Sequence, residues 1–301
     1  MTFGDKLRES RKAAGLSQEE LAEKLNVSRQ AITKWETGAG IPDIGNLMTI
    51  SNLFGIALDD FISEEKLAKP AKTRLYESTT EYDIDGAKDF DIKLGGANSI
   101  TIYGCGSKTS DENEDGAEKI KVVLSSDSYA TLQQDFKTKI DDLKYCIDID
   151  VNRAKNVTET AARELLHIEV FLPNKYLSHT EIDANCKSLS ILNLECKSIE
   201  FDGRASNVTL DGLKGVLEMN CDLDMKVELK SFEGTVELNQ VRASSRITVA
   251  KNQDFRTVVK GLGDSAIYEE NGSTVEDFSS ADSKNLIKLN GMKSELIIER
   301  K

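Results

Sequence analysis

Apolar residues recur at helical spacing near the N-terminus of the chain. Leu21 and Leu25 lie four residues apart and share one helix face, and Ile32 and Trp35 lie three apart on a second helix. Asn26 stands between the two pairs and tolerates the left-handed backbone that a sharp turn needs. The pattern therefore predicts two short helices joined by a tight turn.

Polar residues mark where these two helices begin and end. Ser17 is followed three residues later by Glu20, which is the spacing of a capping box, and Ser28 can cap the second helix. Gly38 follows the last apolar position and predicts the end of the second helix. Both helices are thus bounded by residues that satisfy free backbone groups.

The flanking sequence predicts three more helices around this pair. The first runs over about residues 2–14, with Phe3 and Leu7 facing inward. The fourth begins at Pro42, and a short fifth covers residues 58–62. The fourth helix carries three apolar residues on one face and stops at Gly55: Leu47, Ile50 and Phe54. We expect an all-α five-helix bundle over residues 1–66, large enough for one small core.

The hydrophobic period changes from helical to two beyond a charged stretch at residues 67–81, which we predict to be a linker. Strands are expected where apolar residues alternate, at 90–94, 100–102, 120–124, 147–151 and 168–172. Leu132, Phe136 and Ile140 are four apart and predict one helix over 129–143. Residues 82–301 therefore form a predominantly all-β domain.

The later part of this domain repeats with a period of nineteen residues. Positions 208–220 match positions 227–239, ending in Glu-Met-Asn and Glu-Leu-Asn, and weaker copies begin near 189 and 247. Short strands in matched columns favour stacked rungs of a β-solenoid or roll, because one rung cannot bury its own apolar side. An antiparallel sandwich fits the strand lengths but not the columns.

Four polar residues are left on the outer side of the predicted helix 28–37, namely Arg29, Gln30, Thr33 and Lys34. Arginine and lysine can bind guanine acceptors in the major groove, and glutamine can bind adenine at two atoms. These side chains therefore suit the reading of DNA bases.

The segment from about Phe3 to Ile62 resembles the phage-repressor-like, xenobiotic-response-element type of helix-turn-helix transcriptional regulator, most specifically through SRQAITKWETGAGIPDIGNLMTISNLFGI. The resemblance implies that Gln18 contacts a backbone phosphate and that Arg11 and Glu36 form a structural ion pair. It also implies a DNA-binding group at the second helix, comprising Ser28, Arg29, Gln30, Thr33 and Lys34. The resemblance covers about a fifth of the chain.

The strand-rich part resembles, more loosely, a bacterial repeat-strand domain of adhesin type, through HIEVFLPNKYLSHTEIDAN. We do not expect an adhesive function to transfer. The N-terminus has no apolar stretch typical of an export signal, and the chain carries a DNA-reading head. A cytoplasmic protein is expected.

Charge modifies this picture. The net charge of −13 opposes binding to phosphate, but residues 1–40 hold seven Lys and Arg against six Asp and Glu, a net of +1. We therefore expect modest affinity with a steep salt dependence, and dimerisation would help.

Other candidate chemistry is weaker. The five cysteines lie at positions 105, 146, 186, 196 and 221, and no two share a repeat column, so we expect buried reduced thiols and no metal site. Glu200, Glu218 and Glu237 do share a column; this is either a solvated face or a surface that docks a cation or a basic partner. We find no catalytic constellation or cofactor motif, so we do not expect an enzyme.

These observations predict a DNA-binding transcription regulator, a repressor that binds double-stranded DNA as a homodimer and inserts helix 28–37 into the major groove. The C-terminal domain is expected to serve oligomerisation, or to bind a protein partner or effector. The alternative is a cytoplasmic interaction or scaffold protein whose head binds protein, which the acidic charge favours.

Overall fold

The computed structural model describes residues 3–13, 16–25, 27–36, 40, 42, 46, 49–50, 53–54, 75–106 and 119–301. The chain divides into two compact units, residues 1–73 and 74–301. A few helices form the first unit and a large β-sheet domain forms the second. None of the helices in the described ranges is long and apolar enough to span a membrane.

Three helices of the first unit are described in full: α1 (Phe3–Ala13), α2 (Gln18–Leu25) and α3 (Arg29–Glu36). Residues 46, 49–50 and 53–54 are also helical, and Ile50 and Phe54 contact the same apolar cluster as α2 and α3. Pro42, the predicted start of the fourth helix, is buried but not helical. The remaining residues of that predicted helix, including Leu47 and Gly55, and the predicted helix 58–62 lie outside the described residues.

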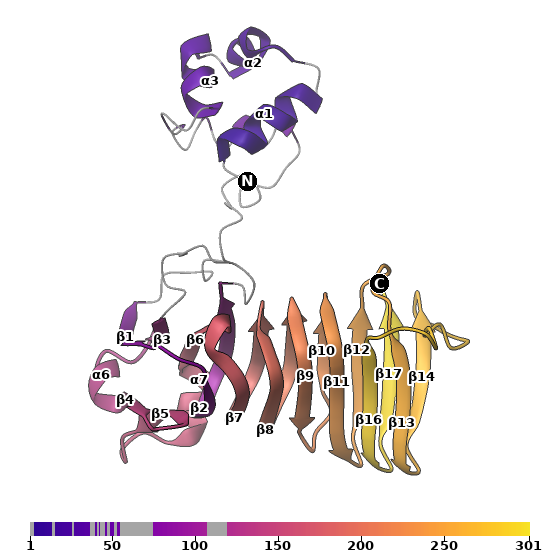
Figure 1. Cartoon of the computed structure of the whole chain (residues 1–301). Helices are drawn as coiled ribbons and strands as arrows, with labels where there is room; N and C mark the ends of the chain where they lie inside the picture. The colour runs from indigo at the N-terminus through magenta and orange to yellow at the C-terminus, as the bar shows by residue number, and fades with distance from the viewer. Residues whose placement is uncertain are drawn as a thin grey trace. The chain divides into compact units, whose positions relative to one another are not determined.

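Where the structure describes the second unit, at residues 75–106 and 119–301, it forms seventeen strands and three short helical segments. Most of them are labelled in Figure 1. The helical segments are α6 (Leu132–Asp135), α7 (Glu159–Leu165) and the 3-10 turn η1 (Asn174–Tyr176). The strands are β1 (Tyr76–Asp83), β2 (Lys88–Cys105), β3 (Lys119–Ser126), β4 (Phe136–Asp142), β5 (Cys146–Arg153), β6 (His167–Pro173), β7 (Leu177–Leu192), β8 (Glu195–Asp211), β9 (Leu213–Asn220), β10 (Lys226–Leu229), β11 (Phe232–Val241), β12 (Ser244–Val249), β13 (Arg256–Leu262), β14 (Ser265–Glu270), β15 (Ser273–Val275), β16 (Leu286–Met292) and β17 (Glu295–Arg300).

Parallel pairing dominates from β2 onward. One row of strands runs β5, β2, β7, β8, β9, β11, β16 and β13. A second runs β6, β2, β7, β8, β10, β12, β17 and β14. The long strands β2, β7 and β8 belong to both rows. The strands β1, β3 and β4 pair antiparallel at the other end of the domain.

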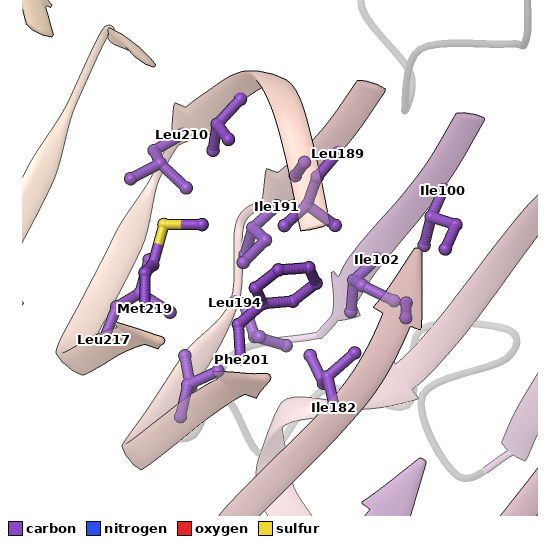
Figure 2. Close-up of a cluster of buried hydrophobic side chains, with 14 of the residues drawn as sticks. Ile100, Ile102, Ile182, Leu189, Ile191, Leu194, Phe201, Leu210, Leu217 and Met219 are labelled. Carbon is purple, nitrogen blue, oxygen red and sulfur yellow. The ribbon is translucent and has the colours of Figure 1, made fainter. Parts of the chain in front are cut away.

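The predicted nineteen-residue columns are strand partners in the structure. Val208 pairs with Val227, and Leu217 and Val236 are likewise opposite each other. The apolar members of each column point into a shared interior, where Ile191, Phe201 and Met219 are completely buried (Figure 2). The repeat therefore stacks equivalent side chains from one strand to the next, as expected when neighbouring repeats bury a continuous core.

The chain departs from sequential stacking at its C-terminal end. Strands β16 and β17 insert between the pair β11–β12 and the pair β13–β14, so that Val236 lies opposite Ile287. Figure 1 shows β16 between β11 and β13. As a result, β13 and β14, and not the last strands in sequence, form the outermost pair.

Two predictions from periodicity are wrong. Residues 129–143 form the short helix α6 and then β4, because the spacing of Phe136 and Ile140 also satisfies a strand and β4 pairs with β5. Residues 76–81, predicted to end the linker, belong to β1. This strand has few apolar residues, but Tyr76 and Tyr82 pack against the core and alternate positions are half-buried.

The helix α7 was not predicted. Thr158 caps it by accepting a hydrogen bond from the Ala161 amide, 3.2 Å away. The helix packs so closely on β2 that a Cβ atom on Gly96 would lie 2.9 Å from the Glu159 side chain. Seven residues with one buried alanine give too short a pattern for periodicity to detect.

The five cysteines are reduced thiols, not joined in disulfides. Cys186, Cys196 and Cys221 are buried in the core, and Cys105 and Cys146 are half-buried. Burial raises the pKa of Cys186 to about 12, so this thiol stays protonated at neutral pH. Cys186 pairs with Ala205 in the adjacent strand, as its repeat column predicts.

The glutamate column lies in register across four strands. Glu200 is opposite Glu218, Glu218 is opposite Glu237, and the column ends at Lys288, whose ammonium pairs with Glu237 at 2.5 Å. Burial and the neighbouring charges of Asp202 and Glu218 raise the pKa of Glu200. Asparagine amides add bonds across the strands, including Asn239 to Glu218 at 2.6 Å.

Candidate nucleic-acid interface

The helices α2 and α3 begin at the polar residues that the sequence singled out. The Ser17 amide donates to Glu20 Oε2 at 2.7 Å, and the Glu20 amide donates to Ser17 Oγ at 3.2 Å, which is a complete capping box. Ser28 Oγ accepts a hydrogen bond from the Ala31 amide at 3.2 Å and caps α3. The hydrogen bond from Ser17 lowers the pKa of Glu20. Local hydrogen bonds thus cap the start of each of the two helices.

Apolar contacts hold α2 and α3 together. Leu21 and Ile32 are fully buried, and Leu7 of α1 completes the contact. Trp35 is 7% exposed and is the only tryptophan of the chain. Since one side of α3 is buried in this cluster, its opposite side is presented outward.

Glu36, the last residue of α3, connects all three helices. Arg11 of α1 donates from Nε to Glu36 Oε1 at 2.6 Å and from Nη2 to Oε2 at 3.1 Å. Gln18 of α2 donates to Glu36 Oε2 at 2.8 Å. Burial alone would raise the pKa of Glu36, but these hydrogen bonds and the charges of Arg11 and Arg8 outweigh it, and the pKa is lowered. The carboxylate is therefore held charged inside the fold.

Gln18 of α2 also forms a hydrogen bond to the exposed side of α3. Its Oε1 accepts a hydrogen bond from Thr33 Oγ1 at 3.3 Å, while its amide nitrogen is bound to Glu36. Thr33 Oγ1 also lies within bonding distance of the Arg29 carbonyl, 3.1 Å away. Gln18 is half-buried, so its side chain is oriented before any ligand arrives.

The remaining candidate residues form one polar face. The side chains of this face are all exposed: Ser28, Arg29, Gln30, Thr33 and Lys34. Positions 29, 30, 33 and 34 differ by one, three, four or five residues and so share one side of the helix, opposite Ile32 and Trp35. The structure thus brings together every residue proposed for base contact, with Gln18 beside them.

Two residues that hold α1 against the end of α3 were not predicted from the sequence. Arg8 donates from Nη2 to the Glu36 carbonyl at 2.9 Å, one helical turn before Arg11. Gly4 allows α1 to approach the end of α3, because a Cβ atom there would lie 2.6 Å from the Trp35 carbonyl oxygen. The spacing of Arg8 and Arg11 was the available signal, since residues three apart share a helix face.

Among solved structures, the chain is similar to a candidate cell adhesion protein from Clostridium sporogenes. The two are 16% identical with a TM-score of 0.35, and the match covers 75% of this chain and 99% of that one.

Curated proteins match the N-terminal part. The HTH-type transcriptional activator BcrR of Enterococcus faecalis is 45% identical over 73 residues, which are 24% of this chain and 36% of BcrR. The immunity repressor of Bacillus phage phi105 is 33% identical over 84 residues, 28% of this chain and 58% of the repressor. The chain thus spans about a third of the length of BcrR.

The HTH-type transcriptional regulator ImmR of Bacillus subtilis is 33% identical over 94 residues, 31% of this chain and 74% of ImmR. A family profile described as helix-turn-helix, HTH_3, matches residues 7–61. These are the residues that carry the capped helix pair and the Arg11–Glu36 contact. The chain therefore belongs to the helix-turn-helix family HTH_3.

Proposed function

We propose that this protein is a sequence-specific DNA-binding regulator of transcription. The observation that carries the proposal is the polar face of α3, whose Arg29, Gln30 and Lys34 are exposed while the opposite side is buried against α2. Relatives named as transcriptional regulators share this part of the chain.

In this proposal α3 enters the major groove of double-stranded DNA. Arg29 and Lys34 would donate to guanine acceptors, and Gln30 would bind adenine through its amide, with Thr33 beside them. Gln18 sits at the first turn of α2, where its remaining amide hydrogen and the free backbone amides can bind phosphate. Ser28 lies at the N-terminal end of α3. The bonds from Gln18 to Glu36 and Thr33 would set the register of these contacts.

We further propose a homodimer that binds two half-sites about one helical turn apart, because a single small helical head offers few base contacts. We expect DNA binding by this dimer to repress transcription, because a bound dimer can block RNA polymerase without contacting another protein. The phi105 relative is named a repressor, whereas BcrR is named an activator. The protein would act in the cytoplasm, with residues 1–66 as the DNA-binding head and a linker that ends before β1 begins at Tyr76.

The parallel columns support a β-solenoid for the remainder of the chain, in which each rung pairs with the next through matched residues. Its role in this proposal is to hold two copies of the regulator together. The acidic glutamate column and the net charge of −13 favour a second candidate function. In this alternative, the protein is an interaction protein whose head binds protein in place of DNA.

Selection of the full-length protein against a random duplex pool at physiological salt tests the proposal. We expect enrichment of a palindromic site, its loss in Arg29→Ala, and its retention in Lys12→Ala, which removes an exposed cation from α1. Absence of enrichment in the wild-type chain would count against DNA reading and favour the interaction protein.

A further inference from the structure

The outermost strand pair leaves one strand edge open. Among the described residues, β13 pairs with β16 alone, whereas β14 is partly covered by β15, through residues 268–270. None of the described strands continues the parallel ladder beyond β13. An open edge presents unpaired backbone donors and acceptors, which another chain can use.

Two backbone hydrogen bonds between β13 and the β16 side show which backbone groups face the open edge. The Arg256 amide donates to the Asn285 carbonyl at 2.9 Å, and the Leu262 carbonyl accepts from the Lys293 amide at 3.0 Å. In a parallel ladder a residue directs its N–H and C=O to the same neighbour, and the next residue directs them to the other side. Thr257 and Val259 therefore direct their backbone groups away from β16, to the open edge.

Exposed apolar side chains adjoin this edge. Val259 is 37% exposed although it lies beside the fully buried Leu289. Val241, Met292 and Leu262 stand opposite one another on β11, β16 and β13, and they are 47%, 43% and 75% exposed. The row Val241, Met292 and Leu262 is an exposed apolar patch that reaches the open edge at Leu262. Such a patch at a sheet edge is typical of an interaction surface.

The same end of the domain is elsewhere covered by the protein itself. Phe278 packs edge-on against Phe255 and Tyr268, at ring centroid distances of 6.1 and 5.2 Å, and the Arg300 guanidinium lies 4.0 Å from the Phe278 ring. Phe255 is 1% exposed. The apolar interior is thus closed at this position, whereas Val259 and Leu262 are left uncovered.

We propose that this surface binds the same surface of a second copy of the chain, with β13 antiparallel to the partner's β13 about a two-fold axis at Val259. The proposal rests on the homodimer proposed above and assigns its interface. The two Val259 residues exchange both of their outward backbone hydrogen bonds. Such an interface is closed, so it produces a dimer and not a filament.

The charges on β13 favour this register over the one centred on Val258. With the axis at Val259, Arg256 lies opposite the partner's Leu262, and Lys260 lies opposite the partner's Val258. A shift of the axis to Val258 would place Arg256 opposite the partner's Lys260, and like charges directly opposite destabilise a pair of strands. In the chosen register the methylene groups of Arg256 can cover the exposed Leu262 side chain of the partner.

Disulfide trapping tests the register directly. A hydrogen-bonded antiparallel pair has Cα atoms about 5.5 Å apart, which suits a disulfide. We expect the full-length Val259→Cys variant to form a covalent dimer under mild oxidation, with the linked peptide identified by mass spectrometry. The matched Val258→Cys variant and the wild-type chain should give none. Equal trapping at both positions, or none at 259, would overturn the assignment.

Sedimentation velocity over a series of concentrations tests the interface without a cysteine. Val259→Pro removes only an outward amide, and Leu262→Glu charges the apolar patch; each should weaken the dimer about tenfold or more. Val216→Glu, at an exposed valine on β9, should leave it unchanged. A monomeric wild-type chain, or a dimer insensitive to both variants, would refute the proposal.

DNA binding is measured separately in the same proteins. If the variants become monomeric and a single half-site is still selected, both proposals stand. If no DNA sequence is selected while the wild-type chain is a dimer that traps at position 259, the interface stands and DNA reading fails.

Discussion

The Arg11 guanidinium lies 2.6 Å from the Glu36 carboxylate and connects the first helix of the head to the end of α3. Both residues are buried, with 9% and 3% of their surface exposed. The same carboxylate binds Gln18, which in turn accepts from Thr33 on the outward side of α3. A scaffold contact and the proposed DNA-reading face are therefore joined through one acidic residue.

Arg11→Ala should destabilise the head by about 3–5 kcal/mol, because it leaves the Glu36 charge buried without its main partner. Trp35 is the only tryptophan and lies in the head, so its fluorescence reports the unfolding of this unit alone. The measurement is a urea titration of the full-length protein. Lys12→Ala, at the exposed neighbouring position, should shift the midpoint little; an equal shift in both variants would contradict the role of the ion pair.

The stability of the head should fall in acid. Since the pKa of Glu36 is lower in the folded state than its ordinary value of 4.5, its charge stabilises the fold above pH 4.5, and this contribution is lost as the pH falls through the folded pKa. Glu36→Gln should be less stable at neutral pH and should lose this part of the acid dependence. The exposed Glu23→Gln variant serves as the control and should keep the wild-type profile.

The close stacking of the β domain predicts a strong effect at Gly234. Its φ of 128° is unfavourable for other residues, and a Cβ atom would lie 2.0 Å from the Gly215 carbonyl oxygen in the adjacent strand. Gly234→Ala should cost at least about 2 kcal/mol, from backbone strain and displacement of the neighbouring strand. Unfolding followed by far-ultraviolet circular dichroism measures this cost. Gly86→Ala, where no atom lies within 4 Å and φ is not positive, should be nearly neutral.

The repeat columns could be predicted from the sequence because parallel pairing places residues nineteen positions apart opposite each other. Val208 and Val227 are one such pair. The insertion of β16 and β17 could not be predicted, because it pairs Val236 with Ile287 and so breaks the period. The strand at Phe136 was missed for a different reason: residues four apart lie on one side of a helix and also on one side of a strand.

The outward residues of α3 followed from the apolar spacing of Ile32 and Trp35, since helix geometry fixes the opposite side. The contacts that orient these residues could not be predicted from that spacing. The bonds from Arg8 and Gln18 to Glu36 join residues that are 28 and 18 positions apart, and their existence depends on how three helices pack. Local pattern thus identifies the face, and tertiary packing determines how rigidly the face is held.

Affinity for a selected site and for an unrelated duplex, measured side by side by fluorescence anisotropy, tests the central claim most directly. Arg29→Ala and Gln30→Ala should each weaken binding to the selected site by about 1–3 kcal/mol, through loss of discrimination at one base pair. Gln30→Ala should leave binding to the unrelated duplex unchanged, whereas Arg29→Ala should weaken it only slightly, through its charge. Equal losses on both duplexes, or no loss on either, would contradict the claim that α3 reads base pairs.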